Sequence, residues 1–414
     1  MSFPRRKLKY VATLNDETLP DVMPDDFEIT YAEISDVSLG APIRWQKEVK
    51  FSDAPSRARR IVKDGDILVS TVRTYLKGIA RVEGAAINAV VSTGFAALRP
   101  RELSSRFLGY VAQSQEFIDE VVSRSVGVSY PAIAPSDLLN ILVPVPSDLE
   151  QRAIADYLDR ETAEIDAFIA DLDEYSTLLS HRLGAERDRT FLSLSDSSAP
   201  VPLKRWLKIP LSYGATAAAD HFDPNEVRYL RITDFGAEGG LRPDVATSLP
   251  HEAAAGYMTA PGDILLARSG ATVGKAFVVP DSLPEACFAG YLVRARCQSR
   301  VEASFVWHAL QTTRYKDWIS ANATVATIQN VSAQKFGTYR IPRPSLAKQA
   351  KVIEELDRTQ KNIEASQALA AEARALAKER RLSLISAAVT GQIDVAAQGM
   401  SAAEQLQDEL EVHP

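Results

Sequence analysis

The stretch from Ser269 to Ala276 has glycine and lysine spacing close to that of a phosphate-binding loop. It reads Ser-Gly-Ala-Thr-Val-Gly-Lys-Ala. A true loop of this kind has four residues between its glycines and a hydroxyl residue after the lysine, where magnesium binds. Here three residues separate Gly270 from Gly274, and Ala276 follows the lysine. The sequence therefore predicts no nucleotide site.

Two other groups have residue types that occur in enzymes. Asp36 with Glu48 and Lys50 has the composition of a metal-dependent nuclease site, but nothing nearby supplies further ligands, so we interpret the spacing as coincidence. The glycines of 235–240 suggest a methyl-donor loop, yet a turn between strands explains them and no Asn-Pro-Pro-aromatic motif for base methylation occurs. The histidines form no cluster. We predict no catalytic residue and no metal site in this chain.

Composition is that of a soluble globular protein: 414 residues, 46% hydrophobic and 24% charged. No apolar run reaches the roughly 18 residues of a membrane span, and the first residues lack the apolar core of a secretory signal, so we expect a cytoplasmic protein. Cys287 and Cys297 have neither metal-ligand nor redox spacing, which predicts small buried side chains.

The chain contains two copies of one plan. Gly65-Asp66-Ile67-Leu68 recurs as Gly262-Asp263-Ile264-Leu265, and the motif Pro-x-Pro-Ser-x-x-x-Gln occurs at Pro144 and again at Pro342. Matching residues along the whole half keep a near-constant offset of 196 to 198. A duplication explains this constancy better than chance does.

We therefore predict an α+β fold with two globular α/β domains, joined by two long antiparallel coiled-coil helices with pseudo-two-fold symmetry. The Gly-Asp-Ile-Leu segments read as strands after tight turns, and a proline-rich opening marks each helix start. The expected boundaries are domain 1 at 1–146, a spacer helix at 147–193, a linker at 194–202, domain 2 at 203–344, a second spacer helix at 345–395 and a flexible acidic tail at 396–414.

Large apolar residues recur every seven residues in the first spacer helix, which is typical of a coiled coil. The second helix is richer in alanine, which permits close approach of a partner helix. The end of the first helix, at Leu183-Gly184-Ala-Glu-Arg, lacks the Ala-Val-Thr-Gly close of the second, which argues against helix continuity past Gly184. The predicted interface residues are Ile154, Leu158, Ile165, Phe168, Leu172, Tyr175, Leu179, Val352, Leu356, Ile363, Leu369 and Leu376.

The net charge of -7 is unevenly distributed. Residues 147–199 hold 13 acidic against 5 basic residues, whereas residues 200–344 hold 12 acidic against 16 basic. The globular parts are thus the more basic ones. A DNA-binding surface is compatible with this distribution, with a partner protein supplying some of the phosphate contacts.

With its two Gly-Asp-Ile-Leu strands, its Pro-x-Pro-Ser helix starts and the close Ala388-Val389-Thr390-Gly391, the chain resembles the specificity subunits of type I restriction-modification systems. The resemblance covers nearly the whole length. It implies two target-recognition domains that each read half of a split double-stranded DNA target. It also implies helices that set the gap and dock two modification (methyltransferase) subunits, with restriction (motor-nuclease) subunits as further partners. S-adenosylmethionine is then expected in the modification subunit and not in this chain.

Candidate DNA contacts follow from residue type and from position beside the repeated strands. Arginine and glutamine bond base edges in a forked manner, whereas lysine mostly holds phosphate. The densest basic run, at 57–63, is assigned to phosphate, with an ordinary exposed loop as the alternative. The full set is Arg44, Lys47, Arg57, Arg59, Arg60, Arg73, Tyr75, Lys77, Arg231, Arg268, Ser269, Lys275 and Gln329, with Lys63 at the end of the basic run.

Two other functions compete with DNA reading. A non-catalytic coiled-coil scaffold whose globular domains bind protein or glycan explains the acidic helices, but not two divergent domains on one framework. An enzyme using Asp36, Glu48 and Lys50 requires magnesium-dependent cleavage by the isolated chain. DNA binding in the presence of a modification subunit separates the first alternative from the leading interpretation.

Overall fold

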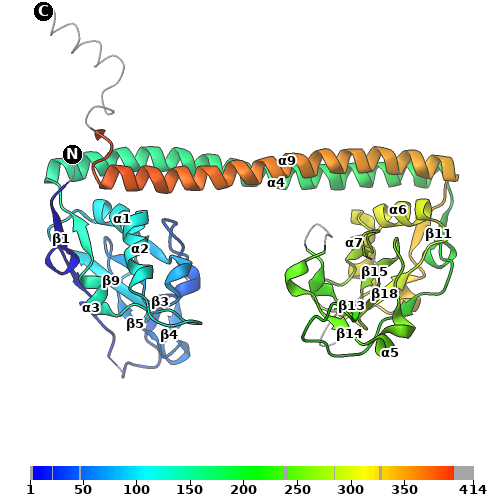
Figure 1. Cartoon of the computed structure of the whole chain (residues 1–414), viewed down its shortest axis with the longest axis horizontal. Helices are drawn as coiled ribbons and strands as arrows, with labels where there is room; N and C mark the ends of the chain where they lie inside the picture. Colours follow the sequence, from blue (N-terminus) through cyan, green and yellow to red (C-terminus); the bar gives the residue numbers. More distant parts are fainter. Residues whose placement is uncertain are drawn as a thin grey trace, which may run out of the picture. The chain divides into compact units, whose positions relative to one another are not determined.

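The computed structural model describes residues 3–20, 22–45, 48–236, 241–283, 285–325 and 329–395. The predicted acidic tail at 396–414 lies outside these ranges. The chain divides into unit 1, residues 1–172 with 371–414, and unit 2, residues 173–370. Each unit contains one globular domain and half of each long helix (Figure 1).

Among the described residues, unit 1 contains two four-stranded sheets and a short two-stranded one. The antiparallel sheet has the order β2-β9-β6-β7, the mixed sheet has the order β4-β3-β8-β5 with β3 and β8 parallel, and β1 pairs with β10. The strands are β1 (Arg5–Lys7), β2 (Ala12–Leu14), β3 (Glu28–Ala32), β4 (Val49–Lys50), β5 (Ala58–Ile61), β6 (Ile67–Ser70), β7 (Ile79–Arg81), β8 (Ala89–Ser92), β9 (Phe95–Pro100) and β10 (Leu142–Pro144).

Unit 2 repeats this plan with different strand lengths. The order β12-β18-β15-β16 corresponds to the antiparallel sheet of unit 1, and β14-β13-β17 corresponds to most of the mixed sheet, again with one parallel pair. The strands are β11 (Pro200–Pro202), β12 (Ser212–Tyr213), β13 (Val227–Leu230), β14 (Ser248–Leu249), β15 (Ile264–Ala267), β16 (Ala276–Val278), β17 (Ala286–Phe288), β18 (Leu292–Ala295), β19 (Thr324–Val325), β20 (Gln329–Asn330) and β21 (Arg340–Pro342). The predicted duplication and α+β class are confirmed.

Short helices cover the antiparallel sheet in both units. In each unit two of these helices follow one another directly, because the side chain of Ser114 or Thr312 accepts a hydrogen bond from the backbone of the second helix and caps its start. The helices are α1 (Ser105–Gln113), α2 (Gln115–Ser123) and α3 (Pro135–Leu139) in unit 1, and α5 (His251–Ala254), α6 (Arg300–Ala309), α7 (Thr313–Asn322) and α8 (Ala333–Phe336) in unit 2.

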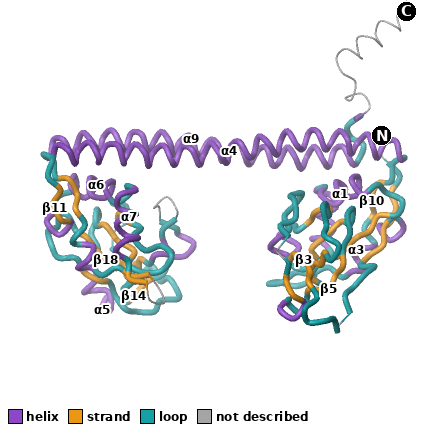
Figure 2. Tube along the Cα trace, turned by 180° about the vertical axis from the view of Figure 1, so that it is seen from behind, coloured by secondary structure: helices purple, strands orange, loops and turns teal. Residues whose placement is uncertain are grey.

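The long helices are α4 (Asp148–Ser197) and α9 (Leu346–Val389). They lie side by side and antiparallel within each unit, as both ribbon views show (Figures 1 and 2). In unit 2, Arg187 of α4 donates to Gln360 of α9, while the earlier Ser180 accepts from the later Gln367. In unit 1, Arg381 of α9 pairs with Asp166 of α4.

Two predicted boundaries need correction. α4 continues through Gly184 to Ser197, so the expected linker at 194–202 is wrong for its first four residues. The physical reason is that Phe191 and Leu194 belong to the unit 2 core, which stabilises the extra turns. The second helix ends at Val389 and not at residue 395, because Gly391 takes a left-handed conformation with φ of 76°.

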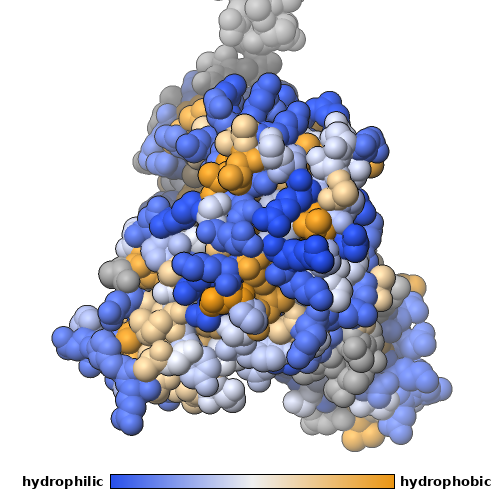
Figure 3. All heavy atoms as spheres, turned by 90° about the vertical axis from the view of Figure 1, so that its right-hand side faces the viewer, coloured by the Kyte–Doolittle hydropathy of each residue, from blue (hydrophilic) through white to orange (hydrophobic). Residues whose placement is uncertain are grey.

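The largest core cluster of each unit lies between its antiparallel sheet, its short helices and its halves of the long helices. In unit 1, Ile67, Phe107, Leu158 and Ile385 belong to one buried cluster. On the face drawn in Figure 3, charged and polar side chains predominate and apolar ones form small patches. In the described part of the chain, no helix is both long and apolar enough to cross a membrane.

Candidate nucleic-acid interface

A buried aspartate at the start of each Gly-Asp-Ile-Leu strand stabilises the strand that precedes a loop with candidate DNA contacts. Asp66 receives two hydrogen bonds from Arg99 on β9, at 2.9 and 2.8 Å, and also accepts from the backbone nitrogen of Lys63. Asp263 makes the equivalent contacts with Arg296 on β18, both at 2.7 Å, and with the backbone of residue 260. The repeated acid is therefore structural, and the residues that follow each strand are positioned by it.

The loop after β6 presents Arg73, Tyr75 and Lys77 at the surface of unit 1. Arg73 and Lys77 both have left-handed backbone, with φ of 49° and 53°. This conformation costs a non-glycine residue about 1 kcal/mol. The Arg73 guanidinium lies 4.7 Å from the centre of the Tyr130 ring, and its backbone nitrogen donates to Pro131. The loop therefore holds two cations and an exposed aromatic side chain in a fixed conformation.

The equivalent loop of unit 2 has glycine at the two positions with left-handed backbone. Gly270 and Gly274 have φ of 80° and 88°. Arg268 stacks on Tyr213, with its guanidinium 4.5 Å from the ring centre, and reaches the side chain of Asn330 at 3.4 Å. Because the guanidinium is held on one face by the ring, its remaining N–H groups are oriented for a ligand.

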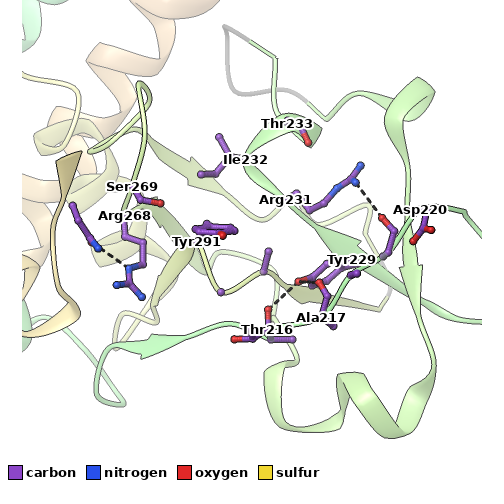
Figure 4. Close-up of a pocket in the computed structure, with 16 residues that line it drawn as sticks. Thr216, Ala217, Asp220, Tyr229, Arg231, Ile232, Thr233, Arg268, Ser269 and Tyr291 are labelled. Carbon is purple, nitrogen blue, oxygen red and sulfur yellow. Dashed lines mark hydrogen bonds between the residues drawn. The ribbon is translucent and has the colours of Figure 1, made fainter. Parts of the chain in front are cut away.

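Arg268 and Ser269 line a cavity of about 1080 Å³ in unit 2. Figure 4 shows Arg268 and Ser269 on one side, Arg231 and Asp220 on the other, and the Tyr291 ring between them. Tyr291 is 69% exposed although it is aromatic. An open hollow with a cation and an exposed ring can accept a planar, polar, negatively charged ligand such as a nucleotide unit of DNA.

Arg231, also predicted as a DNA contact, is held by neighbours inside unit 2. Its guanidinium pairs with the fully buried Asp234 at 3.1 Å and donates to the backbone oxygen of Val245 at 2.7 Å. Asp234 also binds Arg228, whose pKa is lowered by burial. Arg231 thus shapes the wall of the cavity, and its role toward DNA stays a prediction.

The remaining candidates of unit 2 lie at its surface. Lys275 is exposed immediately before β16, and Gln329 is exposed on β20. The backbone oxygen of Gln329 accepts from Gly270 at 3.2 Å, so this strand and the loop after β15 are directly joined. The fold therefore brings Arg268, Ser269 and Gln329 together, and their contact with DNA stays a prediction.

The basic run of unit 1 does not act as one surface. Arg57 pairs with Glu33, Lys63 pairs with Glu17, and Arg59 lies over the Phe51 ring. Burial lowers the pKa of Arg60, whose Nε is enclosed without a hydrogen-bond partner among the described residues. Each of these cations is thus paired, stacked on a ring or partly buried within unit 1. This weakens the assignment of the run to phosphate contacts.

One further candidate of unit 1, Arg44, lies near the nuclease-like residue Asp36. Arg44 donates to the backbone oxygen of Ser35, and Lys47 lies outside the described residues. Asp36 accepts from the backbone nitrogen of Glu33 and so closes a 3-10 turn. Within the described ranges, no group of three potential metal ligands occurs.

Each domain is fixed to its own half of the long helices by a matching polar contact. In unit 1, Tyr110 donates to Asp159 at 2.6 Å; in unit 2, the ring of His308 bonds Asp357 at 2.9 Å. Burial lowers the pKa of His308, and burial also lowers the pKa of Arg187, which donates to the other ring nitrogen, to about 10. Because Arg187 donates to Nδ1, the arrangement fits a ring whose proton is on Nε2 toward Asp357.

Half of the predicted interface side chains of the long helices are buried. Ile154, Leu158, Leu179, Val352, Leu356 and Ile363 are buried, and Ile165 and Leu172 are half-buried. Phe168, Tyr175, Leu369 and Leu376 are exposed instead. Ala370 and Ala377 take the buried positions that the two leucines were expected to fill.

Several aromatic residues of the interface were missed from sequence. Tyr130, Tyr213 and Tyr291 lie beside the predicted arginines, but they are far from them along the chain. The repeat offset relates Pro131 to Gln329, which the sequence had singled out as a DNA contact. Tyr130, the neighbour of Pro131, could therefore have been selected from the sequence. The predicted burial of Cys287 and Cys297 is confirmed, and burial raises the pKa of the Cys287 thiol to about 11.

Comparison with known proteins gives one curated relative and several solved structures. No family model matches the chain. A stretch of 140 residues is 28% identical to the type I restriction enzyme StySPI specificity subunit of Salmonella potsdam, covering 33% of this chain. The match spans 30% of the length of that relative.

Among solved structures, a chain from work on complex assembly and conformational transition of the type I R-M system has a TM-score of 0.63. It is 22% identical, and the alignment covers 95% of this chain and 98% of that one. The HsdS subunit from Thermoanaerobacter tengcongensis, also 22% identical, aligns over 95% of this chain and 97% of that one with a TM-score of 0.43. The first of these shows that the fold of the whole chain has a solved counterpart.

Proposed function

We propose that this chain, which resembles the specificity subunits of type I restriction-modification systems, reads a bipartite DNA target for such a complex. Each globular domain reads one half of the target. The long helices set the gap between the halves and dock two modification subunits, to which restriction subunits are added. The chain itself contributes recognition and no catalysis.

One observation carries this proposal: the two domains share a frame but differ in the residues that the frame presents. The buried forks Asp66–Arg99 and Asp263–Arg296 are equivalent. The loops that follow them display Arg73, Tyr75 and Lys77 in one unit, and a hollow with Arg268 and Tyr291 in the other. A conserved scaffold with divergent presented side chains fits the reading of two different half-sequences.

The exposed apolar side chains of the long helices support the docking part of the proposal. Phe168 and Leu376 are exposed on the helix halves of unit 1, and Tyr175, Leu178 and Leu369 on those of unit 2. Large apolar side chains on an otherwise acidic helix surface are typical of a protein interface. We assign them to contacts with the modification subunits.

S-adenosylmethionine belongs, in this proposal, to the modification subunit. Calorimetry with the purified chain and S-adenosylmethionine is expected to give no binding heat. A micromolar affinity, about -8 kcal/mol, would contradict the non-catalytic assignment.

Genome-wide mapping of adenine methylation, with and without this chain, tests the proposal. A split motif that is methylated only when the chain is present supports it, and an unchanged pattern refutes it. Arg268→Ala then tests the unit 2 loop. We expect relaxed or lost preference in one half-target, by about 1 to 3 kcal/mol, with the other half unchanged. Arg242→Ala is the control, since Arg242 is an exposed arginine paired with Asp244 in the same unit.

A further inference from the structure

Unit 1 carries an apolar tip that the helix and sheet contacts do not explain. It consists of Tyr75, Leu76, Val126, Val128 and Tyr130, all of them exposed, with Val128 fully so. The first two follow β6, and the other three belong to the segment between α2 and α3. Exposed clusters of large apolar side chains mark binding surfaces in soluble proteins.

The two segments of this apolar tip are firmly joined at their base. Arg73 donates its backbone nitrogen to Pro131 at 2.7 Å, and Ile133, which is buried in the core, donates to Thr71 at 2.9 Å. The hydroxyl groups of Thr74 and Ser125 lie 2.8 Å apart. The apolar side chains are thus presented on a rigid base.

A hairpin closes the second segment. Val126 and Ala132 exchange both backbone hydrogen bonds, at 2.9 and 3.0 Å. Gly127 permits the tight turn, because its φ is 117° and an added Cβ would approach the backbone oxygen of Tyr130 at 3.0 Å. The hairpin therefore projects Val128 away from the core.

The charges around the apolar tip indicate its ligand. Neither 71–78 nor 124–132 contains an acidic residue, and Arg73 and Lys77 flank the apolar side chains. Both cations keep a left-handed backbone where the equivalent residues of unit 2 are Gly270 and Gly274. Two non-glycine residues of one loop thus adopt an unfavourable backbone conformation, and this conformation fixes the directions in which the two cations are presented.

We infer that the apolar tip enters a groove of the DNA at the first half-target and partly unstacks a base step, while Arg73 and Lys77 hold the flanking phosphates. This inference rests on the proposed function. Apolar wedges between base steps, flanked by basic residues, bend and unstack duplex DNA in this manner. The first half-target is then selected in part by how easily it deforms, whereas the unit 2 hollow reads by direct contact.

The test uses the chain assembled with its modification subunits and duplexes of the mapped target that carry 2-aminopurine at successive positions. We expect binding to raise the fluorescence several-fold at one step of the first half-target other than the methylated adenine, because unstacking relieves quenching of this base. The methylated adenine is left out, since a methyltransferase extrudes its own target base. Val128→Ser should abolish the rise and weaken binding on the order of ten-fold. Since Val128 is fully exposed, this change removes no core contact.

Ile87→Ser is the matched control, because Ile87 is an apolar, almost fully exposed residue of unit 1 outside both segments. It should leave fluorescence and affinity unchanged. Arg73→Gly separates binding from stability: glycine suits the left-handed backbone, so affinity should fall while the melting temperature stays equal or rises.

Specific binding without a fluorescence rise at any position of the first half-target other than the methylated adenine would overturn the inference and leave the proposed function intact. Loss of assembly with the modification subunits on Val128→Ser would also overturn it, since the apolar tip would then be a protein contact. Absence of any target preference by the wild-type assembly would instead refute the proposed function.

Discussion

Replacing Asp263 by asparagine tests the buried fork that supports the unit 2 reading loop. Asparagine has nearly the same shape, so packing is retained while the charge and one acceptor oxygen are lost. In the native protein, the two carboxylate oxygens accept from Nε and Nη2 of Arg296 and from the backbone nitrogen of Ala260. With one oxygen replaced by an NH₂ group, at least one of these donors faces another donor.

The size of the effect follows from the burial of the two partners. Removing one partner of a fully buried ion pair costs about 3 to 5 kcal/mol. Asp263 is 1% exposed, but Arg296 is 31% exposed and can recover some hydration. We therefore expect Asp263→Asn to lower the free energy of unfolding of unit 2 by about 3 kcal/mol.

Urea unfolding of the full chain measures this loss, and hydrogen exchange of β15 and β18 assigns it to unit 2. Asp281→Asn is the control, because Asp281 pairs with Arg300 in the same unit while both side chains are exposed. That change should cost less than about 1 kcal/mol. A loss below about 1 kcal/mol for Asp263→Asn would refute the structural role assigned to the fork.

Two further predictions concern the long helices. The lowered pKa of His308 means that the unfolded chain takes up a proton that the folded chain does not bind, so stability should fall as the pH drops below about 6.5. His308→Gln should flatten this pH dependence of stability in urea titrations. An unchanged slope in His308→Gln would count against this. Inserting four residues after Ala170 lengthens α4 by about 6 Å. Methylation mapping should then return the same half-targets separated by one or two extra unread base pairs. An unchanged gap at full activity would refute the role of the helices in setting this gap.

Much of the helical framework could be predicted from the sequence, because large apolar residues at heptad spacing mark a buried seam. Leu158 and Leu356 are buried as expected. Leu369 and Leu376 are exposed while Ala370 and Ala377 are buried, since close helix packing favours small side chains that hydrophobicity alone does not select. In the later part of α9 the predicted seam therefore lies one residue away from the observed one.

The interface was less accessible to sequence reasoning, because residue type does not reveal intramolecular partners. Arg231 and Arg57 have the same side chain as Arg268, yet both are held in ion pairs. The aromatic residues beside the candidate arginines come from distant parts of the chain, and only the fold brings Tyr130 to Arg73. The pairing of these aromatic residues with the arginines could be identified only from the three-dimensional structure.

The division of the chain between the units has a consequence for synthesis on the ribosome. Unit 2 is one continuous segment, whereas the core of unit 1 includes Ile385, Ala388 and Val389 from the last part of α9. Residues 1–172 therefore emerge first but lack part of their apolar interior until the final helix is translated. The second domain can complete its fold before the first, so the N-terminal domain is made earliest but completes its apolar core last.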